Sequence, residues 1–287
     1  MNPPTVAQSL AAAQTLGLDR LDAQLLLLHA LGRSGDERAW LLAHDTDTLP
    51  ADTASAFTAL ALRRLAGEPV AYLVGHKEFF GLDFAVDARV LVPRPDTETL
   101  VHWSLEVLGA LPESVQLAVL DLGTGSGAVA LAIADSLPSA GPRARITATD
   151  ASPGPLDVAA ANAQRLGVEV DFLQSHWLRE VGGHFHLIAS NPPYIAAEDP
   201  HLAALKHEPL SALAAGADGL DDLREIIDQA PQHLLAGGWL LLEHGYDQAA
   251  AVRALLGERG FVQVQSRCDL AGIERCSGGQ WVGPSTA

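Results

Sequence analysis

The chain has 287 residues, of which 48% are hydrophobic and 18% charged, so it can bury a core and is unlike a disordered chain. Its formal net charge of −17 disfavours direct nucleic-acid binding and favours a basic protein partner. Its two cysteines, Cys268 and Cys276, form no disulfide framework, so free thiols are expected. The absence of a signal peptide and of a membrane-spanning apolar run predicts a cytoplasmic protein with no membrane partner.

The N-terminal part of the chain carries helical patterns. Leucines recur at helical spacing over 21–31, and an apolar Trp-Leu-Leu segment at 40–42 marks a second helix. A third helix is predicted over 51–65, because the Gly-Glu-Pro sequence at 67–69 would end it. We therefore expect a small helical domain over residues 1–75.

The pattern changes at residues 77–92, which are rich in strand-forming side chains around a turn glycine, Gly81. This composition predicts a β-hairpin that links two domains. The Pro-Arg-Pro sequence at 93–95 predicts an extended approach to the next helix. Asp96 or Thr97 is the expected N-cap of that helix.

Strands and helices alternate in the remainder of the chain. The expected strands are 117–121, 145–149, 168–173, 185–190, 238–243 and 261–266, and the expected helices are 127–136, 154–166, 221–235 and 247–258. Such alternation predicts a doubly wound, mostly parallel sheet whose ligands bind beyond the carboxyl ends of the strands.

A glycine-rich loop joins the first of these strands to its helix, since residues 119–127 read Val-Leu-Asp-Leu-Gly-Thr-Gly-Ser-Gly. Glycines let the backbone turn tightly and approach a ligand closely. The Gly-x-Gly-x-Gly spacing differs from the Gly-x-Gly-x-x-Gly of dinucleotide binders and suits a cofactor without a pyrophosphate. Asp150, 23 residues after Gly127, is expected to end the next strand and accept ribose hydroxyls. Taken alone, the loop leaves NAD binding and a ligand-free tight turn as alternatives.

The predicted strand 185–190 runs into the tetrapeptide Asn191-Pro192-Pro193-Tyr194. Two prolines fit only where the chain leaves the sheet, because proline cannot donate to the ladder. An amide or exocyclic amine nitrogen is a poor nucleophile, and its two N–H groups need acceptors that hold it toward a methyl donor. The Asn191 side chain and the Pro192 backbone carbonyl are suited to this, with Pro193 stiffening the chain and Tyr194 offering a flat stacking face.

With these residues in place, the chain resembles the peptide chain release factor glutamine N5-methyltransferases, the PrmC or HemK family, from about Arg63 to near the C-terminus. The stretches that carry the resemblance are 64–73, 92–98, 121–127, 190–195, 208–209 and 241–245. N6-adenine methyltransferases share the tetrapeptide. The Arg-Pro-Asp-Thr-Glu sequence at 94–98 and the N-terminal helical region therefore discriminate better.

The resemblance implies a class I S-adenosylmethionine-dependent methyltransferase fold, with a seven-stranded sheet. The implied domains are an N-terminal helical substrate-recognition domain over 1–75, a hairpin linker over 76–93 and a methyltransferase domain over 94–287. The implied reaction moves a methyl group from S-adenosyl-L-methionine to the side-chain amide N5 of the glutamine in the Gly-Gly-Gln motif of class I release factors. S-adenosyl-L-homocysteine is the other product, no metal is required, and a monomer is expected.

The resemblance also assigns roles to residues. The implied cofactor contacts are Gly123, Thr124, Gly125, Ser126, Gly127, Asp150, Trp177 and Asn191. The implied glutamine site is Asn191, Pro192, Pro193 and Tyr194, of which Asn191, Pro192 and Tyr194 are the catalytic candidates. One departure concerns His176, because the family commonly has an acid directly before the aromatic residue. A contact from this position to the adenine amino group is therefore in doubt.

Alternative interpretations remain at this point. An adenine-N6 methyltransferase acting on DNA or RNA would need a basic recognition region, and a non-catalytic cofactor-binding protein would not need the tetrapeptide. The sequence Ser277-Gly278-Gly279-Gln280-Trp281 reproduces the substrate's own motif where a last strand should lie. We interpret this match as coincidence, with self-methylation at Gln280 as the minor alternative. The long connection 195–220 is expected to line a protein-substrate groove together with the hairpin and the N-terminal helices.

Overall fold

The computed structural model describes residues 3–137 and 144–283. These residues form two compact units. One runs up to His76 and includes Ala204–His207, and the other comprises Lys77–Ala203 and the residues from Glu208 onward. We call them the N-terminal unit and the sheet unit. Within this described part of the chain, no helix is long and apolar enough to cross a membrane.

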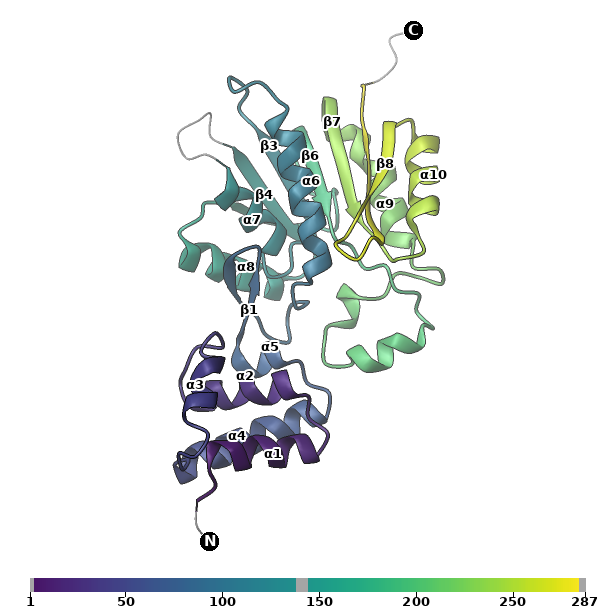
Figure 1. Cartoon of the computed structure of the whole chain (residues 1–287). Coiled ribbons are helices and arrows are strands. Elements are labelled where there is room, and N and C mark those ends of the chain that lie inside the picture. The colour runs from purple at the N-terminus through teal and green to yellow at the C-terminus, as the bar shows by residue number, and fades with distance from the viewer. Residues whose placement is uncertain (1–2, 138–143, 284–287) are drawn as a thin grey trace. The chain divides into compact units, whose positions relative to one another are not determined.

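The N-terminal unit is built of helices (Figure 1). They are α1 (Val6–Thr15), α2 (Arg20–Ala30), α3 (Arg38–Ala43), α4 (Ala51–Leu65) and α5 (Val70–Val74). The three predicted helices correspond to α2, α3 and α4, whereas α1 and α5 were not predicted. Leu26, Leu27 and Phe57 are buried in the core of this unit, and an ion pair of 2.7 Å between Arg64 and Asp22 joins α4 to α2.

The hairpin is a two-stranded sheet of β1 (His76–Phe79) and β2 (Leu82–Ala85). Its two-residue turn, Phe80-Gly81, has positive φ at both positions (52° and 77°), as in the type I′ turn that matches the twist of paired strands. Phe79 and Phe84 are buried and meet edge to face at 6.1 Å. The predicted hairpin is therefore confirmed.

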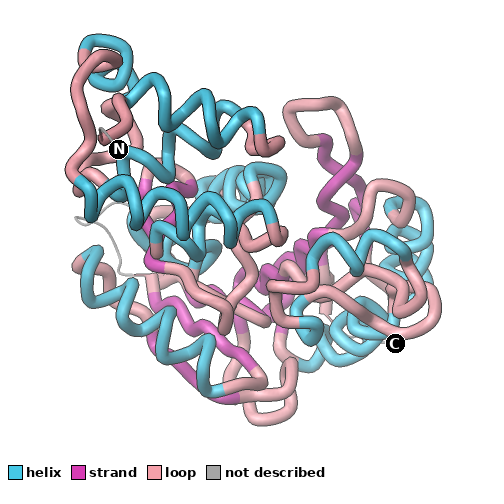
Figure 2. The backbone as a smooth tube through the Cα atoms, turned by 90° about the horizontal axis from the view of Figure 1, so that it is seen from below, coloured by secondary structure: helices cyan, strands magenta, loops and turns pink. Residues whose placement is uncertain are grey.

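The sheet unit contains a seven-stranded sheet in the order β5-β4-β3-β6-β7-β9-β8. Its strands are β3 (Ala118–Leu122), β4 (Arg145–Asp150), β5 (Asp171–Gln174), β6 (Phe185–Ser190), β7 (Leu234–Glu243), β8 (Val262–Cys268) and β9 (Glu274–Gln280). The pairs among β3 to β7 are parallel, and β9 is antiparallel to both β7 and β8. The mostly parallel, seven-stranded fold is thus confirmed, and its strands can be followed in Figure 2.

Helices flank this sheet. They are α6 (Glu98–Gly109), α7 (Ala128–Ser136), α8 (Pro153–Leu166), α9 (Asp221–Gln229) and α10 (Ala249–Arg259), with short 3₁₀ turns η1 (Pro95–Thr97), η2 (Pro200–Leu205), η3 (Leu210–Ala212) and η4 (Ala230–Gln232). Leu223 of α9 and Val252 of α10 share a buried core with Leu120 and Ile188 of the strands. The predicted helix 221–235 was too long, because Pro231 lacks the N–H that an α-helix needs.

The strand register determines which loops meet. Leu122 at the end of β3 pairs with Thr149 of β4 on one side and with Ser190 of β6 on the other. The segments that leave these three strands therefore emerge side by side at the carboxyl edge of the sheet. The glycine loop, Asp150 and Asn191 consequently lie together.

Candidate active site

The glycine loop leaves β3 in a conformation that only glycine adopts readily. Gly123, Gly125 and Gly127 have φ values of +70°, +55° and +85°, in the left-handed region. A Cβ atom on Gly127 would lie 2.9 Å from Leu131, and one on Gly123 would lie 3.2 Å from the Trp177 ring. A Cβ on Gly125 would meet no described atom within 4 Å, so this position faces open space.

Asp121 of β3 fixes the glycine loop. Its buried carboxyl accepts a hydrogen bond of 2.7 Å from the Thr124 hydroxyl, and the Thr124 backbone N–H donates to Thr149 of β4 at 2.8 Å. Burial raises the pKa of Asp121 to about 7, and the nearby charge of Asp150 adds to the rise. The loop is therefore fixed by hydrogen bonds to β3 and β4.

A second support was not predicted. The fully buried Asn162 of α8 donates to the Ser126 carbonyl at 2.9 Å and to the Ala85 carbonyl of β2 at 3.0 Å. Its side-chain oxygen accepts the Ala85 N–H at 2.8 Å. This single amide therefore joins the hairpin to the glycine loop. Nothing in the helical pattern of residues 154–166 distinguishes a side chain that makes such contacts.

Asp150 ends β4 beside the loop, as its spacing predicted. One carboxylate oxygen accepts the Gly125 N–H at 3.2 Å and the other accepts the Ser152 N–H at 3.0 Å. Burial raises the pKa of Asp150, and these backbone donors oppose the rise. Each oxygen keeps a second lone pair with which it can accept a hydroxyl from a bound cofactor.

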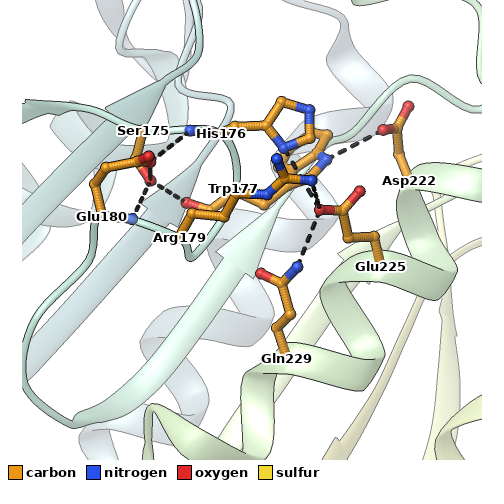
Figure 3. A network of polar contacts seen from close by, with 8 residues as sticks. All are labelled: Ser175, His176, Trp177, Arg179, Glu180, Asp222, Glu225 and Gln229. Atoms are coloured by element: carbon orange, nitrogen blue, oxygen red, sulfur yellow. Dashed lines mark hydrogen bonds and ion pairs between the residues drawn. The ribbon is translucent and has the colours of Figure 1, made fainter.

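Trp177 follows β5 and has a positive φ of 49°. Its indole N–H donates to Asp222 of α9 at 3.1 Å (Figure 3). Its ring lies against Gly123, because a Cβ atom there would be 3.2 Å from it. His176 stands edge to face against this ring, and its Nδ1 lies 3.5 Å from a carboxylate oxygen of Glu225. The indole is thus fixed in place at the end of β5.

Asp222 supplies a carboxylate that the sequence did not reveal. It lines the same cavity as Trp177, and burial raises its pKa. His176 precedes Trp177 in the sequence, and Asp222 supplies a carboxylate to this part of the site. The sequence shows only an acidic first turn of α9, which does not indicate the direction of either side chain.

The tetrapeptide leaves the end of β6, next to β3. The Ser190 hydroxyl donates to the Leu122 carbonyl at 2.8 Å, which ties the two strand ends together. The Asn191 side-chain amide donates to the Thr97 hydroxyl at 3.3 Å. The Tyr194 hydroxyl donates to Glu243 at 3.4 Å, and burial raises the pKa of Tyr194.

Glu243, which contacts the tetrapeptide through Tyr194, was not predicted from the sequence. It ends β7, its residue is only 1% exposed, and one of its two carboxylate oxygens has no hydrogen-bond partner among the described residues. Burial raises its pKa to about 7, while hydrogen bonding from Thr97 lowers it. Thr97 itself occupies the predicted N-cap position of α6 but makes no capping hydrogen bond within the described structure.

An ion pair fixes one wall of the site. Arg94 contacts Glu208 at 2.5 Å, and the buried Glu208 carboxylate also accepts the Val92 N–H at 3.2 Å. Arg94 is extended (φ −101°, ψ 143°), as the flanking prolines predicted. The residues before α6 are thereby held to the segment that leads into η3.

One cavity of about 580 Å³ joins the two halves of the site. The predicted residues that line it are Gly123, Thr124, Gly125, Ser126, Asp150, Trp177, Asn191 and Pro193. Gly127, Pro192 and Tyr194 are not among the described residues that line it. Within residues 3–137 and 144–283, no cluster of three or more His, Cys, Asp or Glu side chains could hold a metal ion.

The C-terminal Gly-Gly-Gln sequence has a packing role. It lies in β9, where a Cβ atom on Gly278 would come within 2.6 Å of the Leu240 carbonyl oxygen. The Gln280 amide donates to the Gly237 carbonyl at 2.9 Å and accepts a hydrogen bond from Gln263 at 2.7 Å. Its amide is therefore engaged within the sheet, which favours coincidence over self-methylation.

The fold and the cavity together define a class I methyltransferase. Two family models match the chain, "PrmC N-terminal domain" at residues 5–75 and "Methyltransferase small domain" at residues 104–212. The release factor glutamine methyltransferase of Bordetella pertussis is 52% identical over 269 residues, which cover 92% of this chain and 95% of that protein. The Burkholderia pseudomallei protein of the same name is 47% identical and covers 98% of each chain.

A solved methyltransferase from Pyrococcus furiosus shares the fold, with a TM-score of 0.52 and 21% identity over 80% of this chain and all of that one. At 21% identity this likeness concerns the fold alone. The two close relatives are similar over nearly the whole chain. The chain therefore belongs to the release factor glutamine methyltransferase family.

Proposed function

We propose that this protein transfers a methyl group from S-adenosyl-L-methionine to the side-chain amide N5 of the glutamine in the Gly-Gly-Gln motif of class I release factors. The observation that carries the proposal is the single cavity lined by both the glycine loop with Asp150 and the amide of Asn191. It occurs in a chain about half identical to two release factor glutamine methyltransferases. The acidic net charge suits a basic protein substrate.

The residues of the first half of the cavity fit the cofactor. We assign its binding to the loop Gly123–Ser126 together with Asp150, Trp177 and Asn191. Gly125 leaves open space above a backbone that a side chain would fill, and the Asp150 carboxylate keeps acceptor capacity for ribose hydroxyls. When bound, S-adenosyl-L-methionine supplies a methyl group on a positively charged sulfur, which the carboxylate-rich site accommodates.

The second half of the cavity positions the amide nitrogen. An amide nitrogen is a poor nucleophile because its lone pair is delocalised into the carbonyl. The Asn191 side-chain oxygen accepts one N–H of the substrate amide and the Pro192 carbonyl accepts the other, so positive charge developing on the nitrogen meets preorganised dipoles. Pro192 and Pro193 limit the reorganisation of these carbonyls. Residues 1–75 contribute recognition of the release factor.

A methylation assay tests this proposal. The protein is incubated with the cofactor and a class I release factor, and the mass of the release factor peptide that contains Gly-Gly-Gln is measured by mass spectrometry. A gain of one methyl group on the glutamine is expected, with none on a release factor whose glutamine is replaced by alanine. Asn191→Ala should lower turnover about 10²–10³-fold, as removal of one preorganised polar group does, with cofactor affinity little changed.

The same assay with adenine-containing DNA and RNA addresses the alternative. Methylated adenine together with an unmodified release factor would refute the proposal. This outcome is informative because the Asn-Pro-Pro-Tyr sequence suits both a glutamine amide nitrogen and the exocyclic amine of adenine. Turnover by Asn191→Ala close to that of the wild type would contradict the role given to Asn191.

A further inference from the structure

The tetrapeptide Asn191–Tyr194 is fixed at its first end by the sheet. Ser190, the residue before it, pairs with Leu122 of β3 and with Leu242 of β7. The Ser190 hydroxyl also donates to the Leu122 carbonyl at 2.8 Å. Two of the four residues are prolines, whose φ is fixed. The direction of the groups proposed to hold the substrate amide therefore depends on how the other end of the tetrapeptide is held.

The other end is held by the side chain of Gln248, at the N-cap position of α10. Its Nε2 donates to the Tyr194 carbonyl at 3.0 Å. The same nitrogen donates to the carbonyls of Asp218 and Gly219, each at 3.3 Å. Tyr194 directly precedes the long connection 195–220, and the other two residues lie near its end. One side-chain amide therefore joins the two ends of this connection.

The main chain selects the orientation of the Gln248 amide. Its Oε1 accepts the Gly245 N–H at 2.8 Å, and the Gln248 backbone N–H donates to the Gly245 carbonyl at 3.1 Å. A backbone N–H can only donate, and a backbone carbonyl can only accept. The side-chain oxygen must therefore face Gly245, and the side-chain nitrogen must face the three carbonyls.

The chain segments approach each other closely at this point. Gly219 has a φ of +75°, and a Cβ atom there would lie 2.2 Å from the Tyr194 carbonyl oxygen and 2.8 Å from Gln248 Nε2. Glycine is the residue that allows both this φ and this approach. Three carbonyl oxygens thus converge on one side-chain donor. Without that donor they would repel one another, and the two ends of the connection would be driven apart.

The connection that Gln248 closes also lines the cavity. Its two arms pair through Ile195, whose N–H donates to the Leu213 carbonyl at 2.9 Å and whose carbonyl accepts the Ala215 N–H at 2.9 Å. The residues just before this pairing that line the cavity are Pro209, Ser211 and Ala212. The contact at Gln248 therefore bears on the tetrapeptide and on one wall of the cavity.

We propose that Gln248 is a positioning residue for methyl transfer. By donating to the Tyr194 carbonyl it fixes the far end of the tetrapeptide, so that the Pro192 carbonyl and the Asn191 side chain stay directed at the substrate nitrogen. Gln248 is not among the described residues that line the cavity, so it acts through the tetrapeptide. This inference rests on the proposed function, because it assumes that those two groups hold the substrate amide.

Two substitutions of Gln248 test this role. Gln248→Met has a similar length but donates no hydrogen bond, so it should lower kcat about tenfold, the scale of one lost hydrogen bond. Gln248→Glu keeps an acceptor toward Gly245, and its carboxyl can donate to the Tyr194 carbonyl only while it is protonated. Once ionised, it places a negative charge beside three carbonyl oxygens.

The dependence of kcat on pH distinguishes the two variants. The three carbonyl oxygens favour the protonated form of the Gln248→Glu carboxyl and so raise its pKa. At about pH 8 this variant should turn over about tenfold or more slowly than the wild type, and the ratio of the two rates should rise about threefold or more by about pH 5.5. Gln248→Met should show no such recovery. The charged or titratable residues of the contacting segments are Asp218, Arg224, Glu243, His244 and Asp247, which all the proteins share.

Cofactor binding and a distant variant provide the controls. The dissociation constant for S-adenosyl-L-methionine should stay within about threefold of the wild type in both Gln248 variants, which also shows that they are folded. Gln164→Glu makes the same chemical change on an exposed residue of α8, and its kcat should equal that of the wild type at both pH values.

The possible outcomes separate the two proposals. If the wild-type protein methylates the release factor glutamine but Gln248→Met turns over at the wild-type rate, the positioning role is wrong and the proposed function stands. A Gln248→Glu rate that is equally low relative to the wild type at both pH values also overturns the role of the donated hydrogen bond. A loss of cofactor affinity as large as the loss of kcat would make Gln248 a general structural residue and overturn the inference. If the wild-type protein leaves the glutamine unmodified, the proposed function fails and this inference fails with it.

Discussion

Replacing Glu243 by glutamine should make the fold more stable at alkaline pH. Burial raises the pKa of Glu243 from its ordinary value of 4.5 to about 7. The folded protein therefore holds this proton more tightly than the unfolded chain does. The stability that protonation contributes is present below about pH 4.5 and is lost as the pH rises through about 7.

The magnitude follows from the two pKa values. The rise from 4.5 to about 7 corresponds to about 3 kcal/mol of unfolding free energy, at ~1.36 kcal/mol per pH unit. Part of this loss is already present at about pH 5, so about 2–3 kcal/mol should disappear between about pH 5 and about pH 8. The glutamine that replaces Glu243 does not titrate, so the variant should escape this loss.

Urea unfolding of both proteins at these two pH values measures the effect, with the fluorescence of the five tryptophans as the signal. Asp121 also titrates near pH 7, but it is present in both proteins, so its contribution cancels in the difference. The advantage of the variant over the wild type should grow by about 2–3 kcal/mol between about pH 5 and about pH 8. An advantage that does not change with pH would refute the account of Glu243 as a buried, strained acid.

Two further predictions concern the cofactor loop. Asp150→Asn should weaken cofactor binding about tenfold to a hundredfold, because hydrogen bonds to charged groups contribute about 1.5–3 kcal/mol, and titration calorimetry measures this; unchanged affinity would contradict the ribose contact. Gly127→Ala should lower the unfolding free energy by about 1–3 kcal/mol, since alanine is strained at a φ of +85° and its Cβ would crowd Leu131. Gly182→Ala is the matched control, because no described atom lies within 4 Å of a Cβ there; equal losses in both variants would contradict the local explanation.

The elements that the sequence predicted well have strong local signals. The alternating strands and helices from Ala118 onward indicated the sheet, and the turn residues indicated the hairpin. Helix α1 was missed because its buried residues include the small Ser9 and Ala13, which leave no leucine stripe. The capping box of Thr5 and Gln8 was the signal that could have found it.

The early start of β7 was missed for a different reason. The strand begins at Leu234 and passes through Gly237, which has a positive φ of 85°, and Gly238. Consecutive glycines normally predict a loop rather than a strand interior. Here a Cβ atom on Gly238 would lie 2.9 Å from the Phe185 carbonyl of β6, so close approach of the neighbouring strand explains the glycine.

The residues of the candidate site also differ in whether the sequence could place them. Asp150 and Asn191 could be placed because each lies at the end of a predicted strand, and parallel strands bring their carboxyl ends to one edge. Asn162, Asp222 and Glu243 could not be placed, since their contacts depend on how a helix or strand is rotated against its neighbours. Sequence periodicity predicts which face is buried but not which polar atom on it meets a partner.

Each half of the site contains a buried acid that accepts a hydrogen bond from a hydroxyl. Asp121 near the end of β3 accepts the Thr124 hydroxyl, and Glu243 at the end of β7 accepts the Tyr194 hydroxyl. In both cases a buried acid with a pKa of about 7 accepts a hydroxyl from a segment at the carboxyl edge of the sheet, the glycine loop or the tetrapeptide. Because each acid costs stability once it ionises, the rigidity of the site and the stability of the fold oppose each other above neutral pH. Substitutions that neutralise either acid should therefore stabilise the protein and impair it together, which a change acting only through packing would not do.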